Sequence, residues 1–188
     1  MKTLLLTTCI CSVENFKDLR RLIISLNKVD SVFFTHYILL QDVDNVDFDE
    51  SEFMTLAVNY KLVIERSSSI ISLSKARNLL IGMVKESYTL DFLPNQHNTS
   101  NLIRYASSNT TIYKSEVFSK VVFFDEDYGV GAKNNGGEDL DFAIRASLES
   151  NNPYFVNSPL IGHRNPLPEF RYKYFKGSFG ILKKHKFK

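Results

Sequence analysis

Short apolar runs alternate with an amphipathic segment in the first forty residues, and this alternation most constrains the fold. Residues 3–10 and 33–40 are apolar and contain β-branched or aromatic residues, which is typical of strands. Between them, Phe16, Leu19, Ile23 and other apolar residues recur at three- and four-residue spacing, which predicts a helix. A strand, a helix and a strand in this order predict parallel pairing through a crossover connection. The sequence therefore predicts an α/β fold with a mostly parallel sheet.

The same pattern continues along the chain. Residues 62–65 predict a third strand, and residues 72–85 predict a capped amphipathic helix. Further expected elements are a short helix over residues 114–117, a strand-like apolar run over 121–127, a helix over 138–149 and a strand over 153–156.

Length and composition indicate one globular domain spanning residues 1–188. Hydrophobic residues make up 44% and charged residues 23% of the 188, which argues against disorder as the main state. A formal net charge of +2 is too small to indicate a nucleic-acid partner. Cys9 and Cys11, with no further Cys or His nearby, are a weak metal signal and fit a reducing compartment. No apolar run approaches the roughly twenty residues that span a bilayer, so a soluble, cytoplasmic protein is expected.

Carboxylates are concentrated between the end of the apolar run over 121–127 and the start of the helix over 138–149. Asp125, Glu126 and Asp127 end the first segment, and a glycine-rich loop leads to Glu138 and Asp139. Open α/β sheets bind ligands at the carboxyl ends of their strands, where acids act as bases or hold a cation. Alternatively, the acids only favour the positive end of the helix dipole and the glycines only form a turn. From the residues alone, both interpretations stay open.

The segment FDEDYGVGAKNNGGEDLDFAIR, residues 124–145, resembles the C-terminal half of the catalytic domain of family 2 glycosyltransferases. The likeness is strongest to bacterial enzymes that build capsule or lipopolysaccharide, which read FDE, then G-x-G, then GED-x-D-F, then arginine. The resemblance implies the GT-A nucleotide-diphospho-sugar transferase fold, with helices on both faces of the sheet. It also implies transfer of a sugar, with inversion, from a UDP- or GDP-sugar to a hydroxyl of a growing surface polysaccharide.

The resemblance also assigns roles to residues. It implies Asp139 as the catalytic base with Glu138 beside it, and it places Gly137 and Asp141 toward the glycan or lipid-linked acceptor. The donor side is implied by Thr8 at the end of the first strand, Asp42 at the end of the second, and SLSKARNLLI, which is similar to the family's S-x-x-R-N segment and contributes Lys75, Arg77 and Asn78.

A divalent cation, Mn or Mg, is implied with His163 as its ligand, because the family's last strand ends in a comparable histidine. By the same resemblance, residues 1–92 are the nucleotide-binding half, residues 104–165 the acceptor and catalytic half, and residues 166–188 a basic aromatic tail. From the residues alone, Asp42 is as well explained as a turn residue, Arg77 as a surface residue and His163 as a structural histidine.

One departure from the family favours a second interpretation. Leu93, Pro94 and Asn95 stand where the family has the Asp-x-Asp motif that holds the metal, and the stretch up to Arg104 is short. The chain would then be a non-catalytic partner or binding subunit that has lost the metal site. A metal-dependent phosphatase or nuclease using the same acids has little support, since few metal ligands are evident and no basic groove accompanies them.

The C-terminal residues combine lysines, aromatics and glycines. Residues 172–185 are similar to the aromatic, basic end of the capsule and lipopolysaccharide enzymes, and residues 183–188 contain four lysines. Two interpretations stay open: a solvated tail, or a peripheral contact with a membrane or a lipid-linked acceptor.

Overall fold

The computed structural model describes residues 4–12, 16–29, 33–42, 49–84, 111, 113, 115–150 and 168–186, and the structural statements below concern these residues. The chain divides into two compact units: Met1–Ile71 with Ala76–Leu90, and Ser72–Lys75 with Asp91–Lys188.

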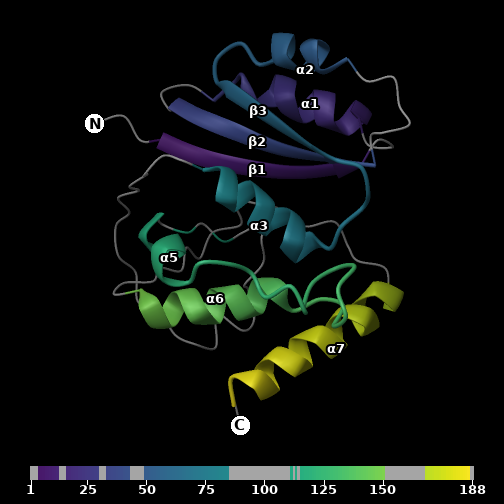
Figure 1. Ribbon diagram of the computed structural model, residues 1–188, viewed down its shortest axis with the longest axis vertical. Helices are drawn as coiled ribbons and strands as arrows, with labels where there is room; N and C mark the ends of the chain where they lie inside the picture. Colours follow the sequence, from purple (N-terminus) through teal and green to yellow (C-terminus); the bar gives the residue numbers. More distant parts are fainter. Residues whose placement is uncertain are drawn as a thin grey trace. The chain divides into compact units, whose positions relative to one another are not determined.

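The first unit contains a parallel three-stranded sheet in the order β1-β2-β3 (Figure 1). The strands are β1 (Leu4–Ser12), β2 (Phe33–Gln41) and β3 (Lys61–Ser67). In the register, Leu4 lies opposite Phe33, and the pairing continues to Ser12 opposite Gln41. The predicted strands and their parallel pairing are confirmed, and each strand extends slightly beyond its expected end.

Helices cover both faces of this sheet. Strand β2 explains why, because alternate residues of a strand point to opposite faces. On one face, Ile38 packs with Ile23 of α1 (Phe16–Leu26) and Phe53 of α2 (Glu50–Leu56). On the other face, Leu39 packs with Leu80 of α3 (Leu73–Met83). A strand buried on both sides needs apolar residues at nearly every position, which accounts for the unbroken run in the sequence.

Helix α2 was not among the elements expected from the sequence, and it follows an acidic stretch, residues 42–49. Asp49 is its N-cap, and the Asp49 side chain accepts a hydrogen bond from Ser51 N at 2.9 Å. The hydrogen bonds from the Ser51 hydroxyl, at 2.6 Å, and from Ser51 N lower the pKa of Asp49. An aspartate at this position satisfies backbone donors that the helix itself leaves unpaired, so part of the acidic stretch is a helix cap.

The second unit contains α5 (Ser115–Lys120), α6 (Glu138–Glu149) and α7 (Pro168–Lys184). Helix α6 packs on α7 through Leu140, Ile144 and Ile181. Its other apolar anchor is Phe142, whose ring stacks on Phe124 at 4.2 Å between centroids. The predicted helix over residues 138–149 is confirmed, and the helix expected over 114–117 begins and ends later in the chain.

The strand expected over residues 121–127 is wrong. The chain bends and turns there instead of entering a strand. The reason lies in Arg145 of α6, whose guanidinium donates hydrogen bonds to the backbone oxygens of Val121 at 3.4 Å and Phe123 at 2.9 Å. A side chain therefore satisfies carbonyl groups that a strand would offer to a neighbour in the sheet.

The C-terminal segment, interpreted from the sequence as a basic aromatic tail, is largely the 17-residue helix α7. The strand expected over 153–156 and the segment containing His163 lie outside the described residues. In the part of the chain that the structure describes, no helix is both long enough and apolar enough to cross a membrane.

Candidate functional site

Helix α6 begins directly after two glycines with left-handed backbone. Gly136 and Gly137 have φ of 94° and 89°, and Gly137 is the N-cap without a side-chain hydrogen bond. A Cβ on Gly137 would lie 2.7 Å from the carbonyl carbon of Gly177 in α7. The glycine pair therefore turns the chain into α6 and lets the backbone pass close to α7.

The loop before the glycines is fixed by backbone and hydroxyl hydrogen bonds. Gly129 N donates to Asn134 O at 3.1 Å, and Asn134 N donates to Asp127 O at 2.8 Å. Ser74, buried in the first turn of α3, donates its hydroxyl proton to Tyr128 O at 2.5 Å. These hydrogen bonds fix the backbone of the loop that leads into α6.

Three carboxylates lie in the first turn of α6, and their exposure differs. Glu138 is 5% exposed and Asp141 is fully buried. Asp139 is half-buried and keeps part of its side chain in solvent. Of the three, Asp139 is the carboxylate that a molecule arriving from solvent would reach most easily.

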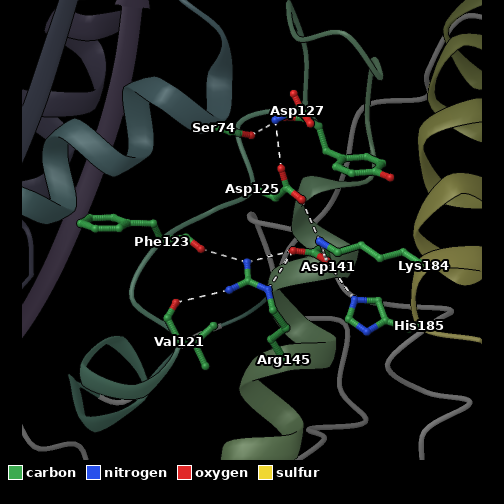
Figure 2. Close-up of polar contacts among 10 residues, drawn as sticks. Ser74, Val121, Phe123, Asp125, Asp127, Asp141, Arg145, Lys184 and His185 are labelled. Atoms are coloured by element: carbon green, nitrogen blue, oxygen red, sulfur yellow. Dashed lines mark hydrogen bonds and ion pairs between the residues drawn. The ribbon is translucent and has the colours of Figure 1, made fainter.

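Asp141 is the buried centre of an ionic cluster whose other members are partly exposed (Figure 2). One carboxylate oxygen, Oδ2, pairs with Arg145 Nη2 at 2.8 Å. The other, Oδ1, lies 2.8 Å from Lys184 Nζ and 2.9 Å from His185 Nε2. Lys184 Nζ also lies 2.7 Å from Asp125 Oδ2, so this single ammonium group joins the acid that precedes the loop to the acid that follows it. The end of α7 is in this way tied to both sides of the loop.

The cluster shifts the pKa of Asp141 and of Lys184. Burial alone would raise the pKa of Asp141, but the hydrogen bonds from Lys184 and His185 and the charge of Arg145 outweigh it and lower the pKa. Burial would likewise lower the pKa of Lys184, but its hydrogen bonds to Asp125 and Asp141 raise it. Asp141 is therefore an anion and Lys184 a cation at neutral pH, each stabilised by the other.

The residues predicted for the donor side lie in β1, directly after β2 and in α3. Thr8 lies in the middle of β1, opposite Tyr37 in the register. Its predicted place at the end of the strand is wrong, because β1 keeps pairing with β2 as far as Ser12. Asp42 does follow β2 directly, with φ of 59°, and its backbone N donates to Ser67 O at 2.9 Å.

In α3, Lys75 is exposed, while Arg77 and Asn78 are half-buried and have interactions within the protein. His163, the predicted metal ligand, lies outside the described residues. The structure thus brings together Gly137, Glu138, Asp139 and Asp141, which share the start of α6.

A divalent cation is not accommodated by the described residues. Within the described ranges, no group of three or more His, Cys, Asp or Glu side chains is placed to hold a metal ion. The carboxylates of Asp125 and Asp141 pair with the ammonium of Lys184, and Asp141 pairs also with the guanidinium of Arg145. His163, the predicted ligand, lies outside the described residues, so the Mn or Mg site stays a prediction.

Sequence reasoning missed the partners of Asp141. Arg145 lies four residues after Asp141 on the same helix, a spacing that brings side chains together and so was a usable signal. Lys184 and His185 follow 43 and 44 residues later, and no local pattern connects them to α6.

Comparison with known proteins gave no match for this chain among protein-family models, curated protein sequences or solved structures.

Proposed function

We propose that the chain is a glycosyltransferase that moves a sugar from a nucleotide-diphosphate donor to a hydroxyl of a growing surface polysaccharide, on the cytoplasmic side of the membrane. The observation that carries the proposal is the first turn of α6, where two of three carboxylates are buried and Asp139 keeps access to solvent. This difference in exposure supports the roles that we propose, with Asp139 as the base and Glu138 and Asp141 as orienting acids.

The parallel sheet agrees with a nucleotide-binding unit. Its order is β1-β2-β3, with α1 and α2 on one face and α3 on the other. In open α/β sheets, ligands bind outside the carboxyl ends of the strands, at the point where successive helices change face. Asp42 directly follows the carboxyl end of β2, at the edge of the sheet where such ligands bind, and this supports its assignment to the donor nucleotide; α1 and α2, before and after β2, lie on the same face, so the change of face is not at this strand. We propose in addition that this sheet belongs to a GT-A fold.

In the proposed reaction, Asp139 takes the proton of the acceptor hydroxyl. The hydroxyl oxygen then bonds to the anomeric carbon while the bond from that carbon to the nucleoside diphosphate breaks, which inverts the configuration. Lys75 and Arg77 are assigned to the negative charge that develops on the leaving diphosphate. Glu138 and Asp141 orient the loop, a role that suits their burial better than direct contact with an acceptor. No step is assigned to a metal ion.

The test is calorimetric binding of UDP and GDP, with and without manganese, together with release of nucleotide from UDP- and GDP-sugars. Asp139→Asn is expected to leave nucleotide affinity within about twofold and to lower turnover at least about 100-fold, the usual contribution of a general base. Glu149→Gln, at the opposite end of the same helix and exposed, is the matched control and should change neither quantity. His163→Ala tests whether manganese contributes to binding.

A non-catalytic binding subunit is the second candidate, favoured by Leu93, Pro94 and Asn95 in place of the aspartates. A binding subunit would bind nucleotide or glycan without turnover. Asp139→Asn would then change neither the nucleotide affinity nor the glycan affinity. Absence of binding of both nucleotides under all conditions would reject the transferase proposal.

A further inference from the structure

Helix α7 has two apolar faces, and only one of them is buried. Gly177 and Ile181 face inward, against the glycine pair and α6. On the opposite side, the rings of Tyr172, Phe175 and Phe179 are 81%, 65% and 59% exposed. Spacings of three and four residues place these rings in one stripe along the helix, and Phe175 stacks on Phe179 at 6.2 Å between centroids.

Lysines accompany the exposed rings. Lys176 and Lys183 lie four residues after Tyr172 and Phe179, so they belong to the same side of α7, and both are exposed. We call this surface, formed by Tyr172, Phe175, Lys176, Phe179 and Lys183, the outer face of α7. Residues 172–188 contain six lysines and no Asp or Glu, in a chain whose net charge is only +2. The outer face is therefore both aromatic and basic.

We propose that the outer face of α7 binds the surface of a membrane that contains anionic lipids, with the helix lying in the plane of the interface. Aromatic rings on one side of a helix enter the boundary between head groups and acyl chains, and lysines beside them meet the phosphates. The inward ion pairs of Lys184 remain intact in this arrangement, so the basic residues that contact lipid are Lys176 and Lys183.

Charge decides between this occupant and a second copy of the chain. Two outer faces placed against each other would bring lysines of the same sign together, whereas an anionic surface is complementary to them. The proposal does not depend on the transfer reaction, because the outer face consists of residues to which no catalytic role is assigned.

The first experiment is sedimentation of the full chain with vesicles of phosphatidylcholine alone and of phosphatidylcholine mixed with phosphatidylglycerol. We expect binding to the mixed vesicles that weakens as salt is raised. The double variant Lys176→Glu, Lys183→Glu should bind at least about 25-fold more weakly, since each lysine near an anionic surface contributes roughly fivefold. Phe175→Ser with Phe179→Ser should lose at least about tenfold.

Matched controls come from the same unit. Leu148→Ser removes an apolar side chain that is 78% exposed on α6, and Lys133→Glu reverses an exposed lysine in the loop. Neither should alter vesicle binding. Circular dichroism of every variant reports whether α7 is retained.

A second measurement tests the proposal without a polar substitution, so it can be used even if a polar variant fails to fold. The chain contains no tryptophan, so Phe179→Trp introduces a unique fluorophore on the outer face, and Leu148→Trp introduces one elsewhere. Mixed vesicles should shift the emission of the first toward shorter wavelength, and brominated lipids should quench it, while the second is unchanged.

The proposal is overturned if the chain binds mixed vesicles no better than neutral ones, or if the outer-face variants bind like the Leu148→Ser control. It is also overturned if light scattering finds a dimer that Phe175→Ser with Phe179→Ser dissociates while no vesicle binding is seen, because the outer face would then hold a second copy. Nucleotide binding in lipid-free solution is measured separately, so failure here leaves the transferase proposal standing.

Discussion

At the scale of single residues, Asp141 is the most constrained side chain of α6. It is fully buried, and Arg145, Lys184 and His185 surround its carboxylate. Asp141→Asn removes the negative charge and leaves two cations without their common partner. Because Arg145 and Lys184 are partly exposed, we expect a loss of about 2–3 kcal/mol in the free energy of unfolding, less than for a fully buried pair.

Urea unfolding followed by circular dichroism measures this loss. Asp18→Asn is the matched control, since Asp18 pairs with Arg21 at 3.5 Å and both side chains are more than 70% exposed. Exposed pairs contribute little, so the control should change the free energy of unfolding by less than about 0.5 kcal/mol. Equal, small effects of both substitutions would mean that the cluster does not stabilise the fold.

At the scale of elements, the contact between the α6 entry and α7 depends on glycine. A Cβ on Gly177 would overlap the backbone oxygen of Gly136 and lie 2.7 Å from Asn135 O. Gly177→Ala should therefore destabilise the protein by about 1–3 kcal/mol, because backbone atoms cannot move aside as a side chain can. Thermal unfolding of the variant measures the effect.

Gly82 in α3 provides the opposite case. A Cβ there meets nothing within 4 Å, so Gly82→Ala should stabilise the protein by about 0.5–1 kcal/mol through the higher helix propensity of alanine. A destabilised Gly82→Ala variant, or a neutral Gly177→Ala variant, would contradict the steric explanation.

The elements that sequence reasoning predicted correctly are those with a clear local pattern, either an unbroken apolar run or a regular spacing. Strand β2, buried on both faces, and α1, buried on one, carry unambiguous patterns. Helix α7 does not, because Ile181 faces inward while Phe175 and Phe179 face outward, so apolar residues occur all around it. Residues 121–127 look like a strand, yet Arg145 takes their carbonyl groups, a long-range interaction that local pattern does not contain.

At the scale of the whole molecule, titratable groups in the two units predict where stability is lost with pH. The pKa of Asp141 is below its ordinary value of 3.8 in the folded protein. Its stabilisation is thus fully present above that value and is lost as pH falls through the folded pKa. Lys184, with a raised pKa, stabilises fully below its ordinary value of 10.5 and loses this contribution as pH rises through the folded pKa. Asp141→Asn should reduce both losses.

In the first unit, Tyr60 also lowers the free energy of unfolding as pH rises into the alkaline range. Burial raises the pKa of Tyr60 to about 12, and its hydroxyl donates to Ile23 O at 3.0 Å. The folded state therefore holds this proton more tightly than the unfolded state, and about 2 kcal/mol should be lost as pH rises from 10 to 12. Tyr60→Phe should flatten the alkaline loss and leave the acid loss unchanged, whereas Asp141→Asn alters both. Free energies of unfolding across pH, with tyrosinate absorbance as the titration signal, measure this difference. An unchanged alkaline loss in Tyr60→Phe would show that Tyr60 does not contribute to it.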